Sequence, residues 1–382
     1  MNTRPLLISY IGFALLLFAS GCTGALRQSG QKGAPYPQSR LISEITWDFS
    51  TITSQRKAKG SDLWPCTWAA DGDLYCAWGD GGGFDGNDDN IGRVSLGFAH
   101  IQGVPSVEDP NAVVGKNIWG SPPYAQVAAS FGGKVGSMTA VKGVLYASGG
   151  FWTRASNPDP VHVSGRGPLS TLAWSTDSAR SWQIAPWVSA EPLGSFLDEG
   201  QDSLEKTRPY LLLYYMRNAD NHHLYLKRIR SDSLQADPAT GHSFQYFSGV
   251  SWFTRHAQWS EQESAAKPIF TDGNNVEGPS AVYDAGLQRY LLTTGHYSSG
   301  NDDDSSAGQV GIFEAPHPWG PWATVGYYEN WANTKEETTG DYLSLRIPSK
   351  WISADGKTLW AVFSGLHSFD SFNVVRAELN LR

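Results

Sequence analysis

The amino-acid sequence predicts an all-β fold, and three observations lead to this prediction. Glycine accounts for 41 of the 382 residues and aromatic side chains for 13%, a composition typical of strands joined by tight turns. No long stretch carries the apolar periodicity of an amphipathic helix. Pairs of apolar strands joined by short turns recur along the chain.

These pairs of strands read as β-hairpins. Four of them turn at short sequences that contain glycine, and the third has a longer loop. The hairpins are SDLWPCTWAADGDLYCAWGD from Ser61, GSMTAVKGVLYASGG from Gly136, LGSFLDEG followed by RPYLLLYYMR, EGPSAVYDAGLQRYLLTTGH from Glu277, and SLRIPSKWISADGKTLWAVFSGLH from Ser344.

Further strands follow each hairpin, which gives five units of about four strands. The last unit lacks one strand, and EITWDFSTIT near the N-terminus is expected to supply it as the outer strand. Repeated four-stranded units joined in this way predict a five-bladed β-propeller whose ring is closed by the N-terminal strand. A six-bladed count requires the long fourth unit to be split, and a β-sandwich does not account for five matched hairpins.

The first residues predict export. MNTR is followed by the short apolar run PLLISYIGFALLLFA and then by ASGC, which is typical of a bacterial lipoprotein signal. We therefore expect a signal peptide over 1–21, lipidation of Cys22, a flexible tether over 22–40 and a single propeller domain over 41–382. The residue after this cysteine is Thr23 and not aspartate, and in this the sequence resembles Gram-negative lipoproteins of the outer membrane. The alternative is an ordinary signal peptide that is cleaved nearby.

The overall charge and composition favour a carbohydrate partner. The net charge of −8 argues against nucleic acid, which binds basic surfaces. Aromatic side chains in an exported protein suit a polysaccharide or oligosaccharide, because the C–H faces of sugars pack on rings. Contact with a membrane is expected through the lipid anchor only, and the chain is expected to be monomeric.

Two cysteines remain once Cys22 is lipidated. Cys66 and Cys76 lie five residues on either side of Asp71, so the first hairpin would place them opposite each other. Because the exported compartment is oxidising, we predict a cross-strand disulfide. Because the chain has so few cysteines to act as soft metal ligands, no metal or other cofactor is expected. The acidic loops 85–90 and 301–306 offer oxygens suited to calcium but lack the EF-hand pattern, so a solvated loop is the alternative.

The predicted topology gathers polar residues on one face. In a propeller the innermost strand of each blade starts on the face to which the second strand returns. Strand starts bring Asp62, Trp64, Glu277 and Asp341 to this rim, and strand ends bring Asp80, Phe151, Arg217, His296 and His367. Paired carboxylates at one site are what the cleavage of a glycosidic bond requires, one as acid and one as base or nucleophile.

Four segments resemble one known family over most of the chain from about Ile45. GSDLWPCTWAADGDLYCAWGDGGGF, VSLGFAHIQGVP, LAWSTDSARSW and APHPWGPWATV together resemble the exported bacterial propellers grouped as domain of unknown function 4185. STDSARSW, residues 175–182, is similar to the Asp-box turn of sialidase-like propellers, with Ala179 in place of its glycine. The wider group includes endo-D-arabinanase-like glycosidases, and its fold is shared with five-bladed arabinanases and xylosidases.

This resemblance implies catalytic roles. Members of that clan use an aspartate of the first blade as base or nucleophile and a glutamate of a later blade, often followed by Gly-Pro, as acid. Asp62 matches the first position and Glu277, in EGPS, matches the second. Asp341 or Asp80 is then the candidate for a third carboxylate that orients the acid. Trp64, Phe151, Arg217, His296 and His367 are expected to bind substrate.

Three functions follow as hypotheses. The first is a lipid-anchored glycoside hydrolase that acts on furanoside or arabinan-type linkages. The second is a lyase on acidic glycans, with His296 or His367 as base and Arg217 neutralising a uronate carboxylate. The third is a glycan-binding lipoprotein without catalytic activity. Each acid also has a structural alternative. Asp62 would cap the start of its strand by accepting from backbone N–H groups, and Glu277 would form a salt bridge with Arg217.

Overall fold

The computed structural model describes residues 33–55, 57–86, 94–119, 131–153, 170–189, 192–203, 209–235, 244–296, 308–332, 344–364 and 370–382. The described part confirms the all-β prediction, because its one α-helix is the short α1 (Ser50–Gln55). The described 3-10 helices are η1 (Gln201–Ser203), η2 (Ser231–Ser233), η3 (Glu263–Ala265) and η5 (Ser349–Trp351). No helix in these ranges has the length and apolar character needed to cross a bilayer.

The first two sheets are four-stranded antiparallel meanders. One runs β2 (Cys66–Trp68), β3 (Leu74–Gly79), β4 (Leu96–Gln102) and β5 (Val114–Trp119). The next runs β6 (Phe131–Val141), β7 (Val144–Thr153), β8 (Thr171–Ser175) and β9 (Gln183–Ile184). Each begins with a predicted hairpin, and the second turns at Lys142 and Gly143, both with positive φ, which matches the right-handed twist of the paired strands.

The middle of the chain forms one ten-stranded sheet. Its strands are β10 (Ser195–Asp198), β11 (Tyr210–Tyr215), β12 (His223–Arg230), β13 (Gln245–Val250), β14 (Ala257–Ser260), β15 (Phe270–Thr271), β16 (Glu277–Asp284), β17 (Arg289–Gly295), β18 (Val310–Ala315) and β19 (Ala323–Tyr328). Two antiparallel groups are joined where β10 pairs in parallel with β16, at Leu197 with Ala281 and Asp198 with Val282. This parallel pairing was not predicted from the sequence.

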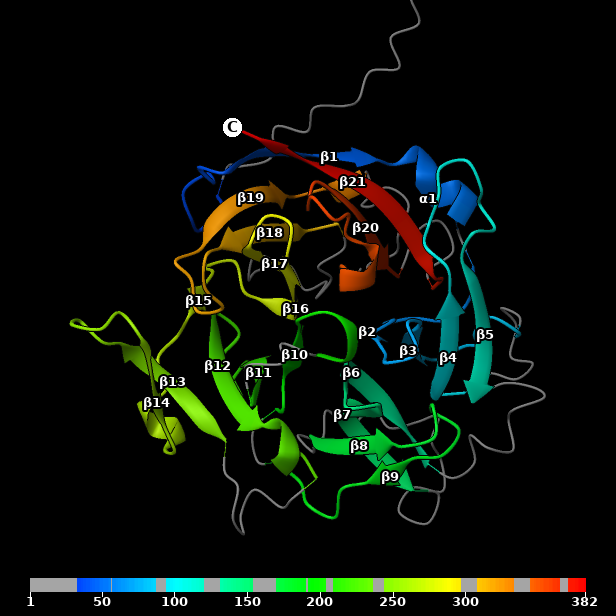
Figure 1. Cartoon of the computed structure of the whole chain (residues 1–382), viewed down its shortest axis with the longest axis horizontal. Helices are drawn as coiled ribbons and strands as arrows, with labels where there is room; N and C mark the ends of the chain where they lie inside the picture. Colours follow the sequence, from blue (N-terminus) through cyan, green and yellow to red (C-terminus); the bar gives the residue numbers. More distant parts are fainter. Residues whose placement is uncertain are drawn as a thin grey trace, which may run out of the picture.

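The last sheet combines the two ends of the chain. It contains β20 (Thr358–Phe363), β21 (Asn373–Leu381) and β1 (Ile42–Asp48), and β1 pairs antiparallel with β21 as its outer strand. The first half of EITWDFSTIT therefore forms an outer strand beside β21, whereas its last four residues, 50–53, belong to α1 and not to a strand. Figure 1 shows the sheets arranged around a common centre, with β2, β6, β10 and β16 innermost.

Turns of different hairpins contact one another: the third meets the first and the second, and the fifth meets the fourth. The Gln201 side chain donates hydrogen bonds to two carbonyls of the first turn, at 3.1 and 3.3 Å. Asp202 accepts from the backbone N–H of Gly143 in the second turn, at 3.0 Å. A Cβ on Gly286 of the fourth turn would lie 2.2 Å from the backbone nitrogen of Gly356 in the fifth. The opposite ends of these hairpins therefore share the other face.

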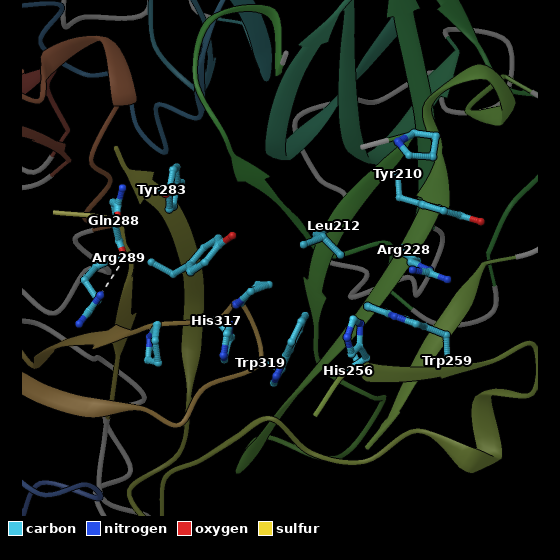
Figure 2. Close-up of a pocket in the computed structure, with 15 residues that line it drawn as sticks. Tyr210, Leu212, Arg228, His256, Trp259, Tyr283, Gln288, Arg289, His317 and Trp319 are labelled. Carbon is cyan, nitrogen blue, oxygen red and sulfur yellow. Dashed lines mark hydrogen bonds between the residues drawn. The ribbon is translucent and has the colours of Figure 1, made fainter. Parts of the chain in front are cut away.

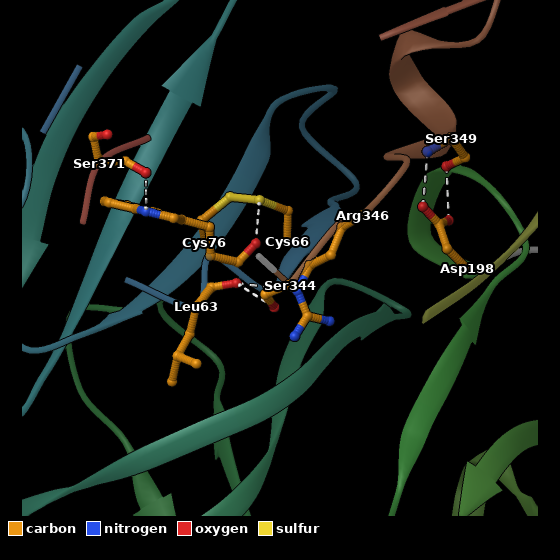
Figure 3. Close-up of a disulfide and its surroundings, with 9 residues drawn as sticks. Leu63, Cys66, Cys76, Asp198, Ser344, Arg346, Ser349 and Ser371 are labelled. Carbon is orange, nitrogen blue, oxygen red and sulfur yellow. Dashed lines mark hydrogen bonds between the residues drawn. A yellow bond between two sulfur atoms is a disulfide. The ribbon is translucent and has the colours of Figure 1, made fainter. Parts of the chain in front are cut away.

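Polar side chains near the centre join strands of different sheets (Figure 3). Asp198 on β10 accepts from the backbone N–H and the hydroxyl of Ser349, at 2.8 and 2.7 Å. The buried Arg346 donates from Nε to the carbonyl of Leu63 and from Nη2 to the carbonyl of Gly136, both at 3.1 Å. Burial raises the pKa of the Asp198 carboxyl.

The predicted disulfide between Cys66 and Cys76 is confirmed. The two residues are direct cross-strand partners on β2 and β3, with a Cα–Cα distance of 4.1 Å. Closing so short a loop stabilises a fold by about 2–3 kcal/mol in the chain-entropy account.

The segment similar to an Asp-box forms the corresponding turn. The backbone N–H of Ala179 donates to the Ser175 hydroxyl at 2.9 Å, and Asp177 accepts from the backbone N–H and hydroxyl of Ser181. Ala179 has a φ of +64°, the left-handed conformation for which the motif uses glycine.

Two residues that precede the predicted domain make contacts with later strands. Tyr36 packs against Phe270 with ring centroids 5.1 Å apart, and its hydroxyl accepts from the backbone N–H of Thr271. Ser39 is fully buried and donates to Glu314 at 2.7 Å.

The buried carboxyl group of Asp284, in the fourth turn, makes the stability of the fold depend on pH. Burial raises the pKa of its carboxyl from 3.8 to about 6. Since the folded state then holds this proton more tightly than the unfolded state, its stabilising contribution is fully present below about pH 4. That contribution is lost as the pH rises through about 6.

We predict that the free energy of unfolding of Asp284→Asn, relative to that of the wild type, is higher at pH 7 than at pH 4 by about 2–3 kcal/mol. Denaturant unfolding of both proteins at the two pH values measures this difference. The pH 4 comparison controls for the turn itself, because an amide oxygen can still accept from the Leu287 N–H, which now donates to Asp284 at 3.0 Å. A difference that does not change with pH would contradict the assignment.

Candidate active site

Asp62 and Asp80 lie at the same end of the first hairpin, as the sequence predicted. Asp62 exchanges two backbone hydrogen bonds with Gly79, the last residue of β3, at 2.9 and 3.0 Å. Asp80 follows directly and has a φ of +48°, which turns the chain at this point. The hairpin therefore brings the two carboxylates to one rim, on the face opposite the turns.

Lys134 on β6 joins this pair and was missed in the sequence. Its ammonium group forms a salt bridge with Asp80 Oδ1 at 2.8 Å, and both side chains are partly exposed. A Cβ on Gly79 would lie 2.4 Å from Asp62 Oδ1 and 2.9 Å from Lys134 Nζ. The missing side chain of Gly79 thus leaves room for a cluster of two carboxylates and one ammonium.

Glu277 occupies the equivalent place in the fourth hairpin. It is the first residue of β16 and pairs with Gly295, the last residue of β17. Its side chain is half-buried. Glu277 and Asp62 therefore each stand where an innermost strand begins, beside the residue at which the second strand returns.

A buried polar group lies beside the returning end of the fourth hairpin. The His296 ring stacks on Tyr327 with centroids 3.9 Å apart, and its Nε2 lies 3.6 Å from Glu329 Oε1. The Tyr327 hydroxyl donates to Asp272 at 3.0 Å, and burial raises the pKa of that carboxyl. Because only 1% of His296 is exposed, its position is that of a packed histidine rather than of a ring that meets substrate.

Trp64 also differs from the sequence expectation. Its side chain is 0% exposed and packs against the rings of Trp78, Phe84 and Phe372. Its Nε1 donates to the backbone carbonyls of Ser61 and Ser371. Trp64 supports the strand that carries Asp62 from within the core and does not offer a face for a sugar.

Arg217 and Phe151 lie at strand ends as expected, but their side chains have local contacts. The Arg217 guanidinium lies 4.2 Å from the centre of the Tyr225 ring and forms a salt bridge with Glu263 at 3.3 Å. Its described ionic partner is therefore Glu263 rather than Glu277. Phe151 on β7 is half-buried and packs against an apolar cluster shared by the first two sheets.

Three predicted residues, Asp341, His367 and Cys22, lie outside the described residues, as do most of the two acidic loops. Asp85, at the start of the first loop, accepts from the backbone N–H of Asn117 at 2.8 Å. The described ranges contain no group of three His, Cys, Asp or Glu side chains that could hold a metal ion.

The ammonium group of Lys134 lies against the Asp80 carboxylate and near the Asp62 carboxylate, so this rim brings carboxyl groups and one cation together. Glu277, which is half-buried, stands at the start of an innermost strand of another sheet.

Comparisons with known proteins bear on the fold. No family model matches the sequence, so the resemblance to domain of unknown function 4185 is not confirmed. No curated protein sequence matches it. Among solved structures, a protein from Bacteroides ovatus described as a candidate hydrolase has a TM-score of 0.50 at 12% identity, covering 87% of this chain and 90% of that one.

Two further structures show a weaker likeness. An α-L-arabinofuranosidase from Podospora anserina, solved with cellotriose, has a TM-score of 0.47 at 10% identity, with 88% of this chain and 98% of that chain covered. A GH43 enzyme from Xanthomonas citri has a TM-score of 0.44 at 12% identity, with coverages of 86% and 93%. At such identities the likeness concerns the fold, and chemistry must be argued from the residues.

Gly79 gives a test of the carboxylate cluster. Gly79→Ala should displace the side-chain ends of Asp62 and Lys134, which can move at little cost to stability, and lower turnover at this site at least about tenfold. The matched control is Gly136→Ala, where the nearest atom to an added Cβ is 3.9 Å away. Thermal melting and turnover of both variants check this, and equal behaviour of the two would contradict the cluster.

Proposed function

We propose that this protein is a glycoside hydrolase that cleaves a polysaccharide, with furanoside or arabinan-type linkages favoured by the family resemblance. We propose further that its five groups of strands are the blades of a five-bladed β-propeller, with β1 closing the ring. The observation that carries the proposal is the equivalent placement of Asp62 and Glu277. Each precedes or begins an innermost strand and lies beside the last residue of the returning strand, Gly79 or Gly295.

The contacts among the turns support a common site for these acids. Since the turns of neighbouring hairpins touch on one face, the strand ends that carry Asp62 and Glu277 belong to the other. Sheets arranged around one centre bring such ends toward the same axis (Figure 1). The proposal requires the carboxyl groups of Asp62 and Glu277 to flank a glycosidic bond near this axis.

In the proposed reaction, Glu277 protonates the glycosidic oxygen as the bond breaks. Asp62 activates a water molecule or attacks the anomeric carbon, and both routes pass through a transition state with positive charge on the sugar ring. A carboxylate held ionised beside that charge stabilises it. Asp80, with Lys134, or Asp341 serves as the third carboxylate that orients the catalytic groups.

We also propose that the mature chain is exported and lipid-anchored through Cys22, which would place the site near the polysaccharides of the cell exterior or periplasm. The support is the sequence ASGC after the apolar run. Cys22→Ser should move the protein from the membrane fraction to the soluble exported fraction. Cell fractionation measures this, and unchanged membrane association would contradict the anchor.

The catalytic proposal predicts large losses on neutralising either acid. Asp62→Asn and Glu277→Gln should each lower turnover by several orders of magnitude, equivalent to about 4 kcal/mol or more of barrier. The assay is the release of reducing ends from whichever polysaccharide a screen of the mature protein identifies. Thermal melting shows whether the fold is kept, and Asp355→Asn in the fifth turn is the matched control on the opposite face.

Two results would contradict this assignment. Near wild-type turnover in both carboxamide variants would show that these acids do not cleave the bond. Products that absorb in the ultraviolet through a new double bond would indicate a lyase, for which Arg217 and the histidines would be the sensitive positions.

A further inference from the structure

A cavity lies beside the middle strands, at the turn end of the fourth hairpin and far from Asp62 and Glu277. It has a volume of about 580 Å³ and is formed by β11, β12 and β14 on one side and by the β16–β17 and β18–β19 turns on the other. Figure 2 shows Tyr283 and Arg289 on one side, Tyr210, Arg228 and Trp259 on the other, and His317 and Trp319 between them. The sequence analysis gave this end of the hairpins no role.

Aromatic rings in fixed orientations form much of the wall. Trp319 stacks on Phe247, with centroids 5.8 Å apart, and on the exposed His317, at 5.1 Å. Trp259 meets the same Phe247 edge to face at 5.9 Å. Tyr210 and the two tryptophans keep part of their surface exposed. Rings held in this way lose little further freedom when a flat ligand packs on them.

Arg228 is placed to meet an anion. Its guanidinium lies between the rings of Tyr210 and Trp259, 4.0 and 4.3 Å from their centres, and its Nε donates to Gln245 at 2.8 Å. Within the described ranges, its two terminal nitrogens have no hydrogen-bond or ion-pair partner. The second arginine of the wall, Arg289, already forms a salt bridge with Glu314 at 3.1 Å.

The charge of the wall differs from that of the whole protein. The lining residues include two arginines and two histidines but no aspartate or glutamate, whereas the chain has a net charge of −8. Local positive charge in an acidic protein favours an anionic ligand. The planar guanidinium matches a carboxylate through two parallel hydrogen bonds.

The hairpin that supplies Trp259 to the cavity also carries exposed aromatic side chains. The β13–β14 hairpin, which supplies Trp259, carries Trp252 and Phe253 at its tip, 75% and 92% exposed. The guanidinium of Arg255 lies 5.0 Å from the Trp252 ring. A ligand longer than the cavity would therefore find further rings and another cation along the same hairpin.

We propose that this cavity is a second glycan-binding site that holds an acidic sugar unit, with its carboxylate on Arg228 and its ring on the exposed part of Trp259. It is separate from the carboxylate site, because Tyr283 and Glu277 lie near opposite ends of β16, roughly 20 Å apart at 3.3 Å per residue. The inference does not rest on the proposed hydrolase, since binding here needs neither Asp62 nor Glu277.

The test uses trigalacturonate as probe and galactotriose as its neutral counterpart, with binding followed by calorimetry on the mature protein. The wild type should bind one trigalacturonate at this site, at least tenfold tighter than galactotriose. Arg228→Gln should remove that difference, and Trp259→Ala should weaken binding of the acidic probe at least tenfold. Arg230→Gln, on the same strand but exposed and paired with Asp232, is the matched control.

Two further variants and a competition with inorganic phosphate complete the test. Asp62→Asn combined with Glu277→Gln should leave binding of trigalacturonate unchanged, so that a loss there would assign the ligand to the other site. If Arg228→Gln lowers the melting temperature, the binding of trigalacturonate to His256→Ala, an exposed change at the rim of the cavity, gives a second measurement of this site. The proposal is overturned if the wild type does not prefer the acidic probe, if Arg228→Gln keeps the preference, or if inorganic phosphate displaces the probe at equal concentration.

Discussion

Hydrogen bonds between different sheets near the centre are the interactions on which the candidate active site depends. Within the described ranges, the first two sheets share no backbone ladder with their neighbours. Arg346 compensates for this, because one guanidinium bonds the carbonyls of Leu63 and Gly136 in two separate sheets. Leu63 directly follows Asp62, and Gly136 lies two residues beyond Lys134. A single buried side chain from a third segment thus sets the distance between the carboxylate and the ammonium.

Much of the fold could be predicted because its hairpins are specified locally. Turn sequences such as Lys142-Gly143 favour the backbone angles that a tight hairpin needs, and the alternation of apolar residues fixes which strands follow. The pairing of β1 with β21 followed from counting strands in the last unit. The parallel contact of β10 with β16 could not be read in this way, because it depends on how two whole units pack, and no local sequence feature encodes it.

The site was predicted in part for the same reason. A hairpin necessarily brings its two outer ends together, so the proximity of Asp62 and Asp80 followed from the chain alone. Side-chain direction did not, because it depends on packing against other sheets: Trp64 points into the core, and His296 lies under Tyr327. Lys134 comes from the neighbouring sheet. Extending the second hairpin two residues toward the N-terminus, and applying the same rule for strand starts, would have placed it at this rim.

The two sites use opposite ends of one rigid hairpin and opposite charges. The fourth hairpin carries Glu277 where it faces the carboxylate rim and Tyr283 and Arg289 where it borders the cationic cavity. The hairpin pairs from Ser280 to Asp284 and again at Glu277, so its paired strands hold the two proposed sites apart, and a ligand in one does not compete for atoms of the other. Binding a polymer at the cavity would raise its effective concentration at the rim through linkage alone. In the proposed reaction such linkage would lower the substrate concentration needed for half-maximal rate and leave kcat unchanged, because binding away from the reacting bond does not lower its barrier.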